Sequence, residues 1–373
     1  MIARRTYLTV SFVLVISVGA LLIAALPSRA VETLPTQISD SAFWTMISDF
    51  SEEGGYFRYE NFLSNELAFQ DIIPSLQQIT KPGGVYLGVG PEQNFTYLVA
   101  IEPKIAFIID IRRQNMLEHM MYKALFEISA DRAEFLSRLF SRKPPLDVKA
   151  DMSAEALFRA YQSVEPDRQL YKENQQRIKD LLVTQHKFGL TVDDLEKLAY
   201  VYSVFFDAGP HLDYSFGGFG GSGMPTYADL MSTTDEQGEN RSYLASEENF
   251  RLVKGMEEEN LIVPLVGDFA GPTTIRRVAE YLKEHDARVT VFYTSNVEQY
   301  LFQQGADWRH FYSSVATLPV DSTSTFIRSI SGGGFSRGYG FRFQSVLASM
   351  PDLIKGYEEG RIRNYNDVIE LSK

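Results

Sequence analysis

The chain has 373 residues, of which 45% are hydrophobic and 23% are charged, so it is long enough to form one elaborated folded domain or two. Its formal net charge is −12. Because an acidic surface repels phosphate groups, we expect no nucleic-acid partner. The chain has no cysteine, which excludes disulfides, thiolate metal sites and cysteine nucleophiles.

The first thirty residues differ from the rest of the chain. Arg4 and Arg5 precede an apolar run at 7–26, which a small-x-small sequence follows at 28–30. This order is typical of a signal peptide and predicts cleavage after Ala30, with export to the periplasm or the outside of the cell. The run is close to the roughly 20 residues that span a bilayer. An uncleaved inner-membrane anchor is therefore the alternative, and it is the only membrane contact that we expect.

Residues 31–81 precede the first predicted strand and carry many aromatic side chains. Apolar residues from Phe62 to Ile73 recur with roughly helical spacing, and a Pro-Gly-Gly sequence at 82–84 ends the pattern. We therefore predict a helical lead-in at 31–81 that packs on the first strand.

Two short apolar runs, 85–89 and 105–109, are typical of buried strands. The first run ends in a turn that contains Gly88 and Gly90, and Asp110 follows the second. A strand, a glycine turn, a crossover and an acid about twenty residues further on outline a nucleotide-binding βαβ unit.

Residues 131–259 show helical patterns and almost no strand signal. We predict that they form a helical insertion, between the second and third core strands, within a domain at 82–373. Inside the insertion, 209–225 is dense in glycine with interleaved aromatic residues. We expect an ordered loop over a pocket there, because a plain linker would carry fewer aromatic side chains.

The alternation of strands and helices returns in the second half of the chain, with apolar runs at 261–266 and 288–293. It predicts an α/β fold with a Rossmann-like, doubly wound, mostly parallel sheet. Pro264 inside the first of these runs favours a strand start or a bulge. We expect one more strand at 324–330, a glycine-rich loop, and terminal helices in 341–372.

Ligands bind at the carboxyl ends of the strands in an open parallel sheet. The candidate cofactor-binding residues at these ends are Gly88, Gly90, Glu92, Asp110 and Asp268. Over residues 80–120 and 258–305 the arrangement resembles the class I S-adenosylmethionine-dependent methyltransferase fold. The chain also resembles bacterial proteins that carry such a domain.

The resemblance implies a role for several of these positions. The turn at Gly88 and Gly90 would pass under the methionine part of the S-adenosylmethionine cofactor. Asp110 would bind the ribose hydroxyls, and Asp268 would lie near the methyl donor and acceptor. The sequence departs from the family at Glu92, where the turn usually has its third glycine, and it lacks the Asp/Asn-Pro-Pro-Tyr motif.

Elementary chemistry gives the same positions related roles. Glycine lets the backbone approach a ligand closely, and the Asp110 carboxylate suits two vicinal hydroxyls. Glu92 would attract an amine or sulfonium and repel a pyrophosphate, which favours a zwitterionic nucleoside over a dinucleotide. The alternative for Asp110 and Asp268 is a helix cap, at the helices that begin at Ile111 and after Gly271.

Two functions follow from these observations. The first is an exported or membrane-tethered protein that binds S-adenosylmethionine or a related nucleoside and transfers a methyl group to an acceptor. The second is a catalytically inactive protein of the same fold that acts as a binding or interaction module in the cell envelope. Export conflicts with the first function, because S-adenosylmethionine is made and kept in the cytosol.

Other chemistries lack residues to carry them. A loop histidine beside an acid, here His211 and Asp213, is more often structural than a metal ligand, so we predict no metal site. The sequence has no Gly-x-Ser-x-Gly, Walker or His-Glu-x-x-His pattern, which argues against hydrolase, phosphoryl-transfer and zincin chemistry. Catalytic residues, the acceptor and any protein partner stay unassigned.

Overall fold

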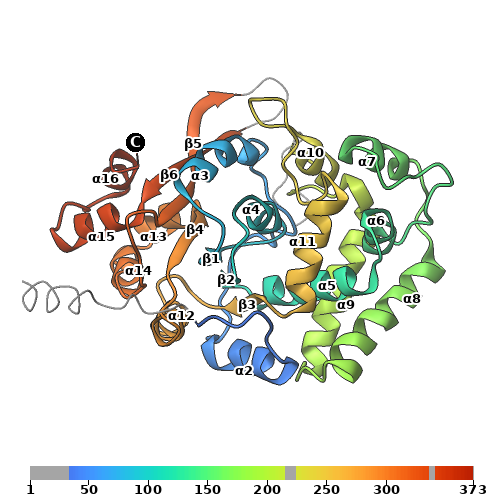
Figure 1. Cartoon of the computed structure of the whole chain (residues 1–373), viewed down its shortest axis with the longest axis horizontal. Helices are drawn as coiled ribbons and strands as arrows, with labels where there is room; N and C mark the ends of the chain where they lie inside the picture. Colours follow the sequence, from blue (N-terminus) through green and yellow to red (C-terminus); the bar gives the residue numbers. More distant parts are fainter. Residues whose placement is uncertain (1–32, 215–223, 336–340, 373) are drawn as a thin grey trace, which may run out of the picture. The chain divides into compact units, whose positions relative to one another are not determined.

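The computed structural model describes residues 33–214, 224–335 and 341–372 (Figure 1). Residues 34–373 form one compact unit. The predicted signal peptide or anchor, with its cleavage site at Ala30, lies outside the described residues. Among the residues that are described, no helix is long and apolar enough to cross a membrane.

Six strands form one sheet. They are β1 (Val85–Gly88), β2 (Ile105–Asp110), β3 (Ile262–Val266), β4 (Val289–Ser295), β5 (Thr325–Phe335) and β6 (Phe341–Ser349). Their order across the sheet is β3-β2-β1-β4-β5-β6. Neighbouring strands are parallel from β3 to β5, and β6 pairs with β5 antiparallel. The prediction of an α/β fold with a mostly parallel sheet is therefore confirmed.

Helices precede, separate and follow the strands. The lead-in and the first strand pair carry α2 (Asp40–Phe50), η1 (Phe69–Ile72), α3 (Ile73–Ile79), α4 (Gln93–Ile101) and α5 (Arg113–Ile128). Between α5 and β3 lie α6 (Arg132–Phe140), α7 (Ala154–Gln162), α8 (Arg168–Lys179), the π-helical turn η2 (Asp180–Gln185), α9 (Val192–Ala208), η3 (Gly209–His211), α10 (Tyr227–Ser232) and α11 (Glu247–Glu258). The C-terminal part carries α12 (Thr274–Glu284), α13 (Val297–Gln303), α14 (Asp307–Val315), α15 (Met350–Glu358) and α16 (Tyr365–Glu370).

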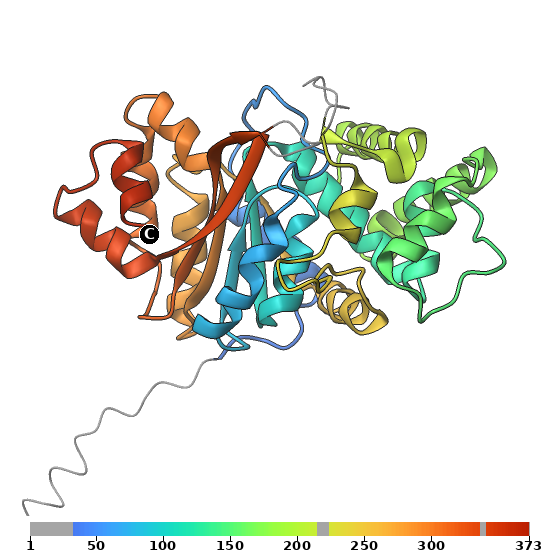
Figure 2. The ribbon, with the colours of Figure 1, turned by 90° about the horizontal axis from the view of Figure 1, so that it is seen from above.

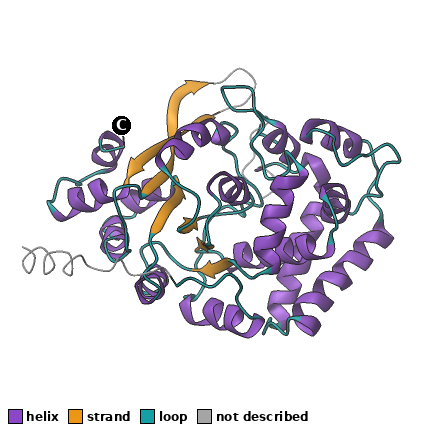
Figure 3. Cartoon of the chain, viewed as in Figure 1, coloured by secondary structure: helices purple, strands orange, loops and turns teal. Residues whose placement is uncertain are grey.

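The helical insertion lies between β2 and β3, as predicted. Its helices gather on the opposite side of the strands from α12–α16 in two perpendicular views (Figures 1 and 2). The strands run between these two helical groups (Figure 3). The sheet and both groups share one hydrophobic core. The insertion is therefore packed into the same unit as the sheet, whose strand ends stay available for a site.

Continuous apolar runs explain the central strands. Every residue of β1 and β2 is buried, as expected for parallel strands that are covered on both faces. Pro264 lies in the middle of β3, opposite Ile108 of β2. The prediction of a strand start or a bulge is wrong, because β3 is the edge strand and an edge tolerates a residue without an N–H donor.

The predicted terminal helices in 341–372 are only partly present. Residues 341–349 form β6, and α15 and α16 follow it. β6 pairs along most of its length with β5, which extends to Phe335 through the expected glycine loop. The segment forms a strand because it pairs with β5, and the spacing of apolar residues within the segment does not show that pairing.

The lead-in is helical only at its two ends, in α2 and in η1 with α3. The residues between these helices cross the carboxyl ends of three strands, and we call 51–66 the crossing segment. The N–H of Glu52 donates to the Val266 carbonyl at the end of β3 (2.8 Å), and the N–H of Gly55 donates to the Ile111 carbonyl just after β2 (2.8 Å). Backbone pairing with strand ends thus replaces the helix that was predicted here.

Candidate functional site

A cavity of about 330 Å³ opens at the carboxyl ends of the parallel strands. Residues that follow β1, β2, β3 and β4 line it, and the crossing segment supplies a further wall from Tyr56 to Glu66. Its volume lies at the lower end of the range for small-molecule sites, roughly 300–1,000 Å³. The expectation that these strand ends converge on one site agrees with this geometry.

The structure brings together three of the five predicted site residues. Gly90, Asp110 and Asp268 line the cavity, whereas Gly88 and Glu92 do not. Gly88 is the last residue of β1 and contacts side chains that hold the turn in place, and Glu92 is the N-cap of α4. Their positions therefore give them structural roles.

Gly90 has the conformation and the open space that a ligand floor needs. Its φ is +76°, a value that L-residues adopt at a cost, and a Cβ built on it would meet no atom within 4 Å. A Cβ at Gly88 would instead overlap Asn94 Oδ1 and the Tyr86 ring. Gly88 is thus required for internal packing, and Gly90 borders the cavity.

Asn94 in α4 fixes the glycine turn, and sequence reasoning missed it. Its Nδ2 lies 3.0, 3.1 and 2.7 Å from the carbonyl oxygens of residues 89–91, and its Oδ1 accepts a hydrogen bond from the Tyr86 hydroxyl (2.8 Å). The imidazole Nε2 of His119 also lies 2.9 Å from the Gly90 carbonyl oxygen. The carbonyl groups of the turn therefore point away from the cavity. The only sequence signal was an asparagine one helical turn after the glycines.

Glu92 begins α4 and is fully buried. Its Oε1 accepts the N–H of Ser64 (3.2 Å), and its Oε2 has no partner among the described residues. Burial raises the pKa of Glu92 to about 8, although the Ser64 hydrogen bond opposes this shift. Glu92 is not placed to contact a cationic ligand in the cavity, because its side chain points to the crossing segment.

Asp110 forms a buried ion pair with Arg112. Its Oδ1 accepts from the backbone N–H (2.8 Å) and Nε (3.0 Å) of Arg112, and its Oδ2 accepts from Nη2 (2.8 Å). The same guanidinium donates to the carbonyl oxygen of Glu60 in the crossing segment. A carboxylate offers about four acceptor positions, so one position on Oδ2 stays available for a ligand hydroxyl.

Asp268 lies two residues after the end of the edge strand β3 and does not cap the helix after Gly271. Its Oδ1 accepts the N–H of Ala270 (2.8 Å). The cap of α12 is Glu52 of the crossing segment, whose Oε1 accepts the N–H groups of Thr273 (2.6 Å) and Thr274 (3.0 Å). The capping alternative is therefore wrong for Asp268. A carboxylate distant in sequence occupies that helix end.

Glu66 is the cavity carboxylate that sequence reasoning missed. It is only 3% exposed, and it lies where β1 and β4 end. Its Oε1 accepts hydrogen bonds from Tyr293 Oη (2.9 Å) and Ser295 Oγ (2.5 Å), and its Oε2 accepts one from Gln93 Nε2 (3.1 Å). Burial raises the pKa of Glu66, and these donors oppose the shift. No local pattern marks a glutamate in an irregular segment as a site residue.

Aromatic rings form much of the remaining wall. Phe57 meets Tyr300 edge-on at 5.3 Å and Tyr59 at 5.6 Å between ring centroids. The guanidinium of Arg58 lies 4.7 Å from the centroid of Tyr59 and 5.8 Å from that of Tyr300. The wall therefore presents aromatic faces that already hold one cation.

The described ends of the predicted loop at 209–225 adjoin this wall. Tyr214 and Met224, at the two ends of the undescribed stretch 215–223, both line the cavity. His211 does not line it, and Asp213 pairs through its backbone with Thr226. Within the described ranges, no group of His, Asp and Glu side chains forms a metal site.

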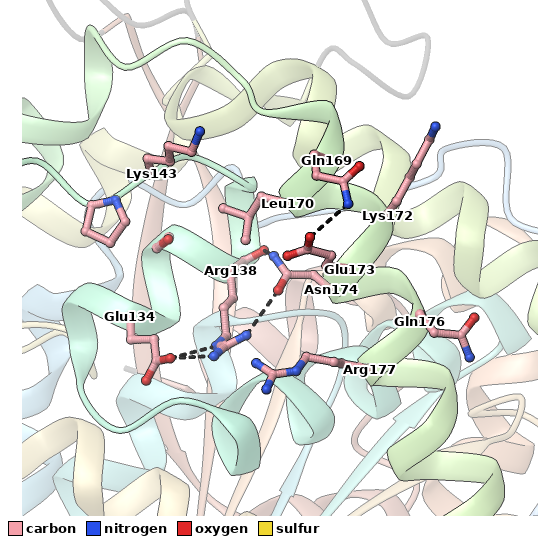
Figure 4. Close-up of a pocket in the computed structure, with 12 residues that line it drawn as sticks. Glu134, Arg138, Lys143, Gln169, Leu170, Lys172, Glu173, Asn174, Gln176 and Arg177 are labelled. Atoms are coloured by element: carbon pink, nitrogen blue, oxygen red, sulfur yellow. Dashed lines mark hydrogen bonds and ion pairs between the residues drawn. The ribbon is translucent and has the colours of Figure 1, made fainter.

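A larger hollow, of about 800 Å³, lies in the insertion between α6 and α8 (Figure 4). Arg138 there pairs with Glu134 and donates to Asn174 Oδ1 (3.1 Å), and Gln169 donates to Glu173 (2.8 Å). Because its lining comes from the insertion and includes no residue at the strand ends, we assign the candidate site to the smaller cavity.

The fold and this cavity define an α/β protein with a mostly parallel sheet and a ligand-sized hollow at the carboxyl ends of its strands. Residues 62–370 match the family described as Domain of unknown function (DUF7790), and the chain belongs to that family. Comparison with curated proteins gave no match. The matched range contains the strands and Glu66, and it leaves out the first part of the crossing segment.

Proposed function

We propose that the protein binds a small zwitterionic nucleoside, with S-adenosylmethionine as the first candidate, in the cavity at the strand ends. The observation that carries the proposal is Gly90, which has a positive φ and open space at the carboxyl end of the central strand. The strand order is that of a doubly wound, Rossmann-like sheet, although the last strand runs antiparallel to its neighbour.

The cavity offers a partner for each part of such a ligand. The free acceptor position on Asp110 suits a ribose hydroxyl, and the aromatic wall around Tyr59 and Tyr300 suits the adenine ring. With S-adenosylmethionine bound, the reaction that follows is methyl transfer to an acceptor at the same edge of the sheet. The acceptor stays unassigned.

Localisation is part of the proposal. We propose that residues 1–30 export the protein or, alternatively, that residues 7–26 anchor it in the inner membrane. An anchor with the domain in the cytosol would reconcile the N-terminal segment with a cytosolic cofactor. Resistance of the membrane-bound protein to alkaline extraction would support the anchor, and release would support cleavage.

Calorimetric titration of the purified domain with S-adenosylmethionine and S-adenosylhomocysteine tests the ligand. We expect binding to the wild type and at least about tenfold weaker binding to Gly90→Ala, whose Cβ would enter the cavity. Gly238→Ala is the matched control, because Gly238 has a similar φ of +84° and equally open surroundings but does not line the cavity. No heat with either compound at millimolar concentration would reject the proposal.

The Asp110–Arg112 ion pair favours a second function. This pair occupies three of the roughly four acceptor positions of Asp110. We therefore propose, as the alternative, a catalytically inactive protein of the same fold that acts as a binding or interaction module in the cell envelope. This function predicts that Asp110→Asn leaves the cellular phenotype intact. A loss of phenotype that parallels a loss of nucleoside binding would reject it.

A further inference from the structure

Glu66 is the acidic residue of the cavity lining that is both buried and without an ion pair, because Asp110 pairs with Arg112 and Asp268 is only partly buried. It is almost fully buried, yet no cationic side chain among the described residues pairs with it. Arg112 is engaged by Asp110, and Arg58 lies over aromatic rings. A buried carboxylate without a counter-ion is costly to the fold, so its presence in a cavity wall indicates a binding role.

Three donors hold Glu66 in one orientation. Tyr293 and Ser295 reach its Oε1 from the end of β4, and Gln93 reaches its Oε2 from the first turn of α4. Gln93 is itself fixed, because its Oε1 accepts from Ser64 and its Nε2 also donates to Tyr97. These contacts fix the carboxylate in place and oppose the rise in the pKa of Glu66 that burial causes.

The backbone at the end of β4 is shaped for this contact. Ser295 has a φ of +49°, a left-handed conformation that non-glycine residues adopt rarely and at a cost. The pairing of β4 with β5 is irregular between Tyr293 and Ser295. This departure from a regular strand accompanies two hydroxyl groups that both donate to Glu66.

The neighbouring wall is suited to positive charge. The rings of Tyr59 and Tyr300 already contact the guanidinium of Arg58, and cations bind well to the faces of tyrosine rings. The side chains in the lining with formal charge are Glu66, Asp110, Asp268, Arg58 and Arg112, which leaves the wall with one negative charge in excess.

We propose that Glu66 is the counter-ion for an onium group of the ligand, such as a sulfonium or a quaternary ammonium. The proposal rests on the ligand site proposed above and names the group that this site selects. It predicts that the protein prefers a charged ligand to an uncharged ligand of the same shape.

The test uses choline and its uncharged isostere 3,3-dimethyl-1-butanol, titrated into the full chain by calorimetry. We expect the wild type to bind choline roughly tenfold more tightly than the isostere and Glu66→Gln to lose this preference. The control Glu60→Gln removes the same charge from the crossing segment but outside the cavity lining, so it should keep the preference. Equal binding of the two compounds by the wild type, or an unchanged preference in Glu66→Gln, would overturn the proposal.

Two further measurements keep the outcomes distinct. If Glu66→Gln does not fold, Glu66→Asp replaces it, and this variant should retain a preference for choline because it retains the charge. A choline preference without binding of S-adenosylmethionine or S-adenosylhomocysteine would support the role of Glu66 and reject the nucleoside. Equal binding of those two nucleosides with no choline preference would support the nucleoside site and reject the role of Glu66.

Discussion

Replacement of Asn94 by alanine should loosen the glycine turn and destabilise the protein. Asn94 is fully buried, and its Nδ2 contacts the carbonyl oxygens of residues 89–91. An amide nitrogen has two hydrogens, so these contacts count as two hydrogen bonds, each with a net value of about 1 kcal/mol. The buried Tyr86 hydroxyl would lose its acceptor, which adds about 1 kcal/mol. The expected loss in the free energy of unfolding is about 3 kcal/mol.

Urea unfolding, followed through the fluorescence of Trp44 and Trp308, measures this loss. The double variant Asn94→Ala/Tyr86→Phe is the control, because it removes the orphaned hydroxyl together with its acceptor. We expect it to be about 1 kcal/mol more stable than the sum of the two single changes predicts. A loss below about 1 kcal/mol in Asn94→Ala, with additive effects in the double variant, would refute the account of the turn.

Two other contacts give measurable expectations. His186 lies 2.9 Å from Asp40 Oδ2 and 2.8 Å from Glu127 Oε2, and hydrogen bonds to both carboxylates raise its pKa above 6.5 despite partial burial. A raised pKa stabilises the fold below the unfolded-state value and loses this effect as the pH rises through the folded-state value. The stability difference between the wild type and His186→Gln should therefore shrink from about pH 6 to about pH 9, and a difference that grows would contradict this. Glu52→Ala should lower the free energy of unfolding in urea by about 1–2 kcal/mol through loss of the α12 cap. Glu52→Gln, which keeps an acceptor, should lower it less. Equal losses in the two variants would contradict the capping role.

The central sheet could be predicted because its information is local. The strands β1 to β4 are short continuous apolar runs, and glycine or acidic residues follow several of them. β6 was missed because its partner β5 decides its conformation. The crossing segment was missed because backbone hydrogen bonds to distant strand ends, and no spacing of its own, fix its path.

The site was predictable only in outline. Gly90, Asp110 and Asp268 could be found because they directly follow strands. Glu66 could not, since its partner Ser295 lies 229 positions further along the chain. The role of Glu92 was misjudged for a related reason, because the sequence does not show which side of a turn a side chain takes.

The carboxylates at this edge of the sheet differ in the groups that they bind within the protein. Glu52 caps α12, Asp110 neutralises Arg112, and Glu92 accepts a backbone N–H beneath the turn. Each of these groups has a structural task that a ligand would disturb. In the cavity lining, Asp268 and Glu66 both lack an ion pair among the described residues, but Asp268 is only partly buried whereas Glu66 is 3% exposed. Glu66 is therefore the carboxylate whose electrostatic energy a charged ligand would improve most. The proposed counter-ion therefore lies at the end of β4, beside the glycine turn at which the sequence pattern predicted the site.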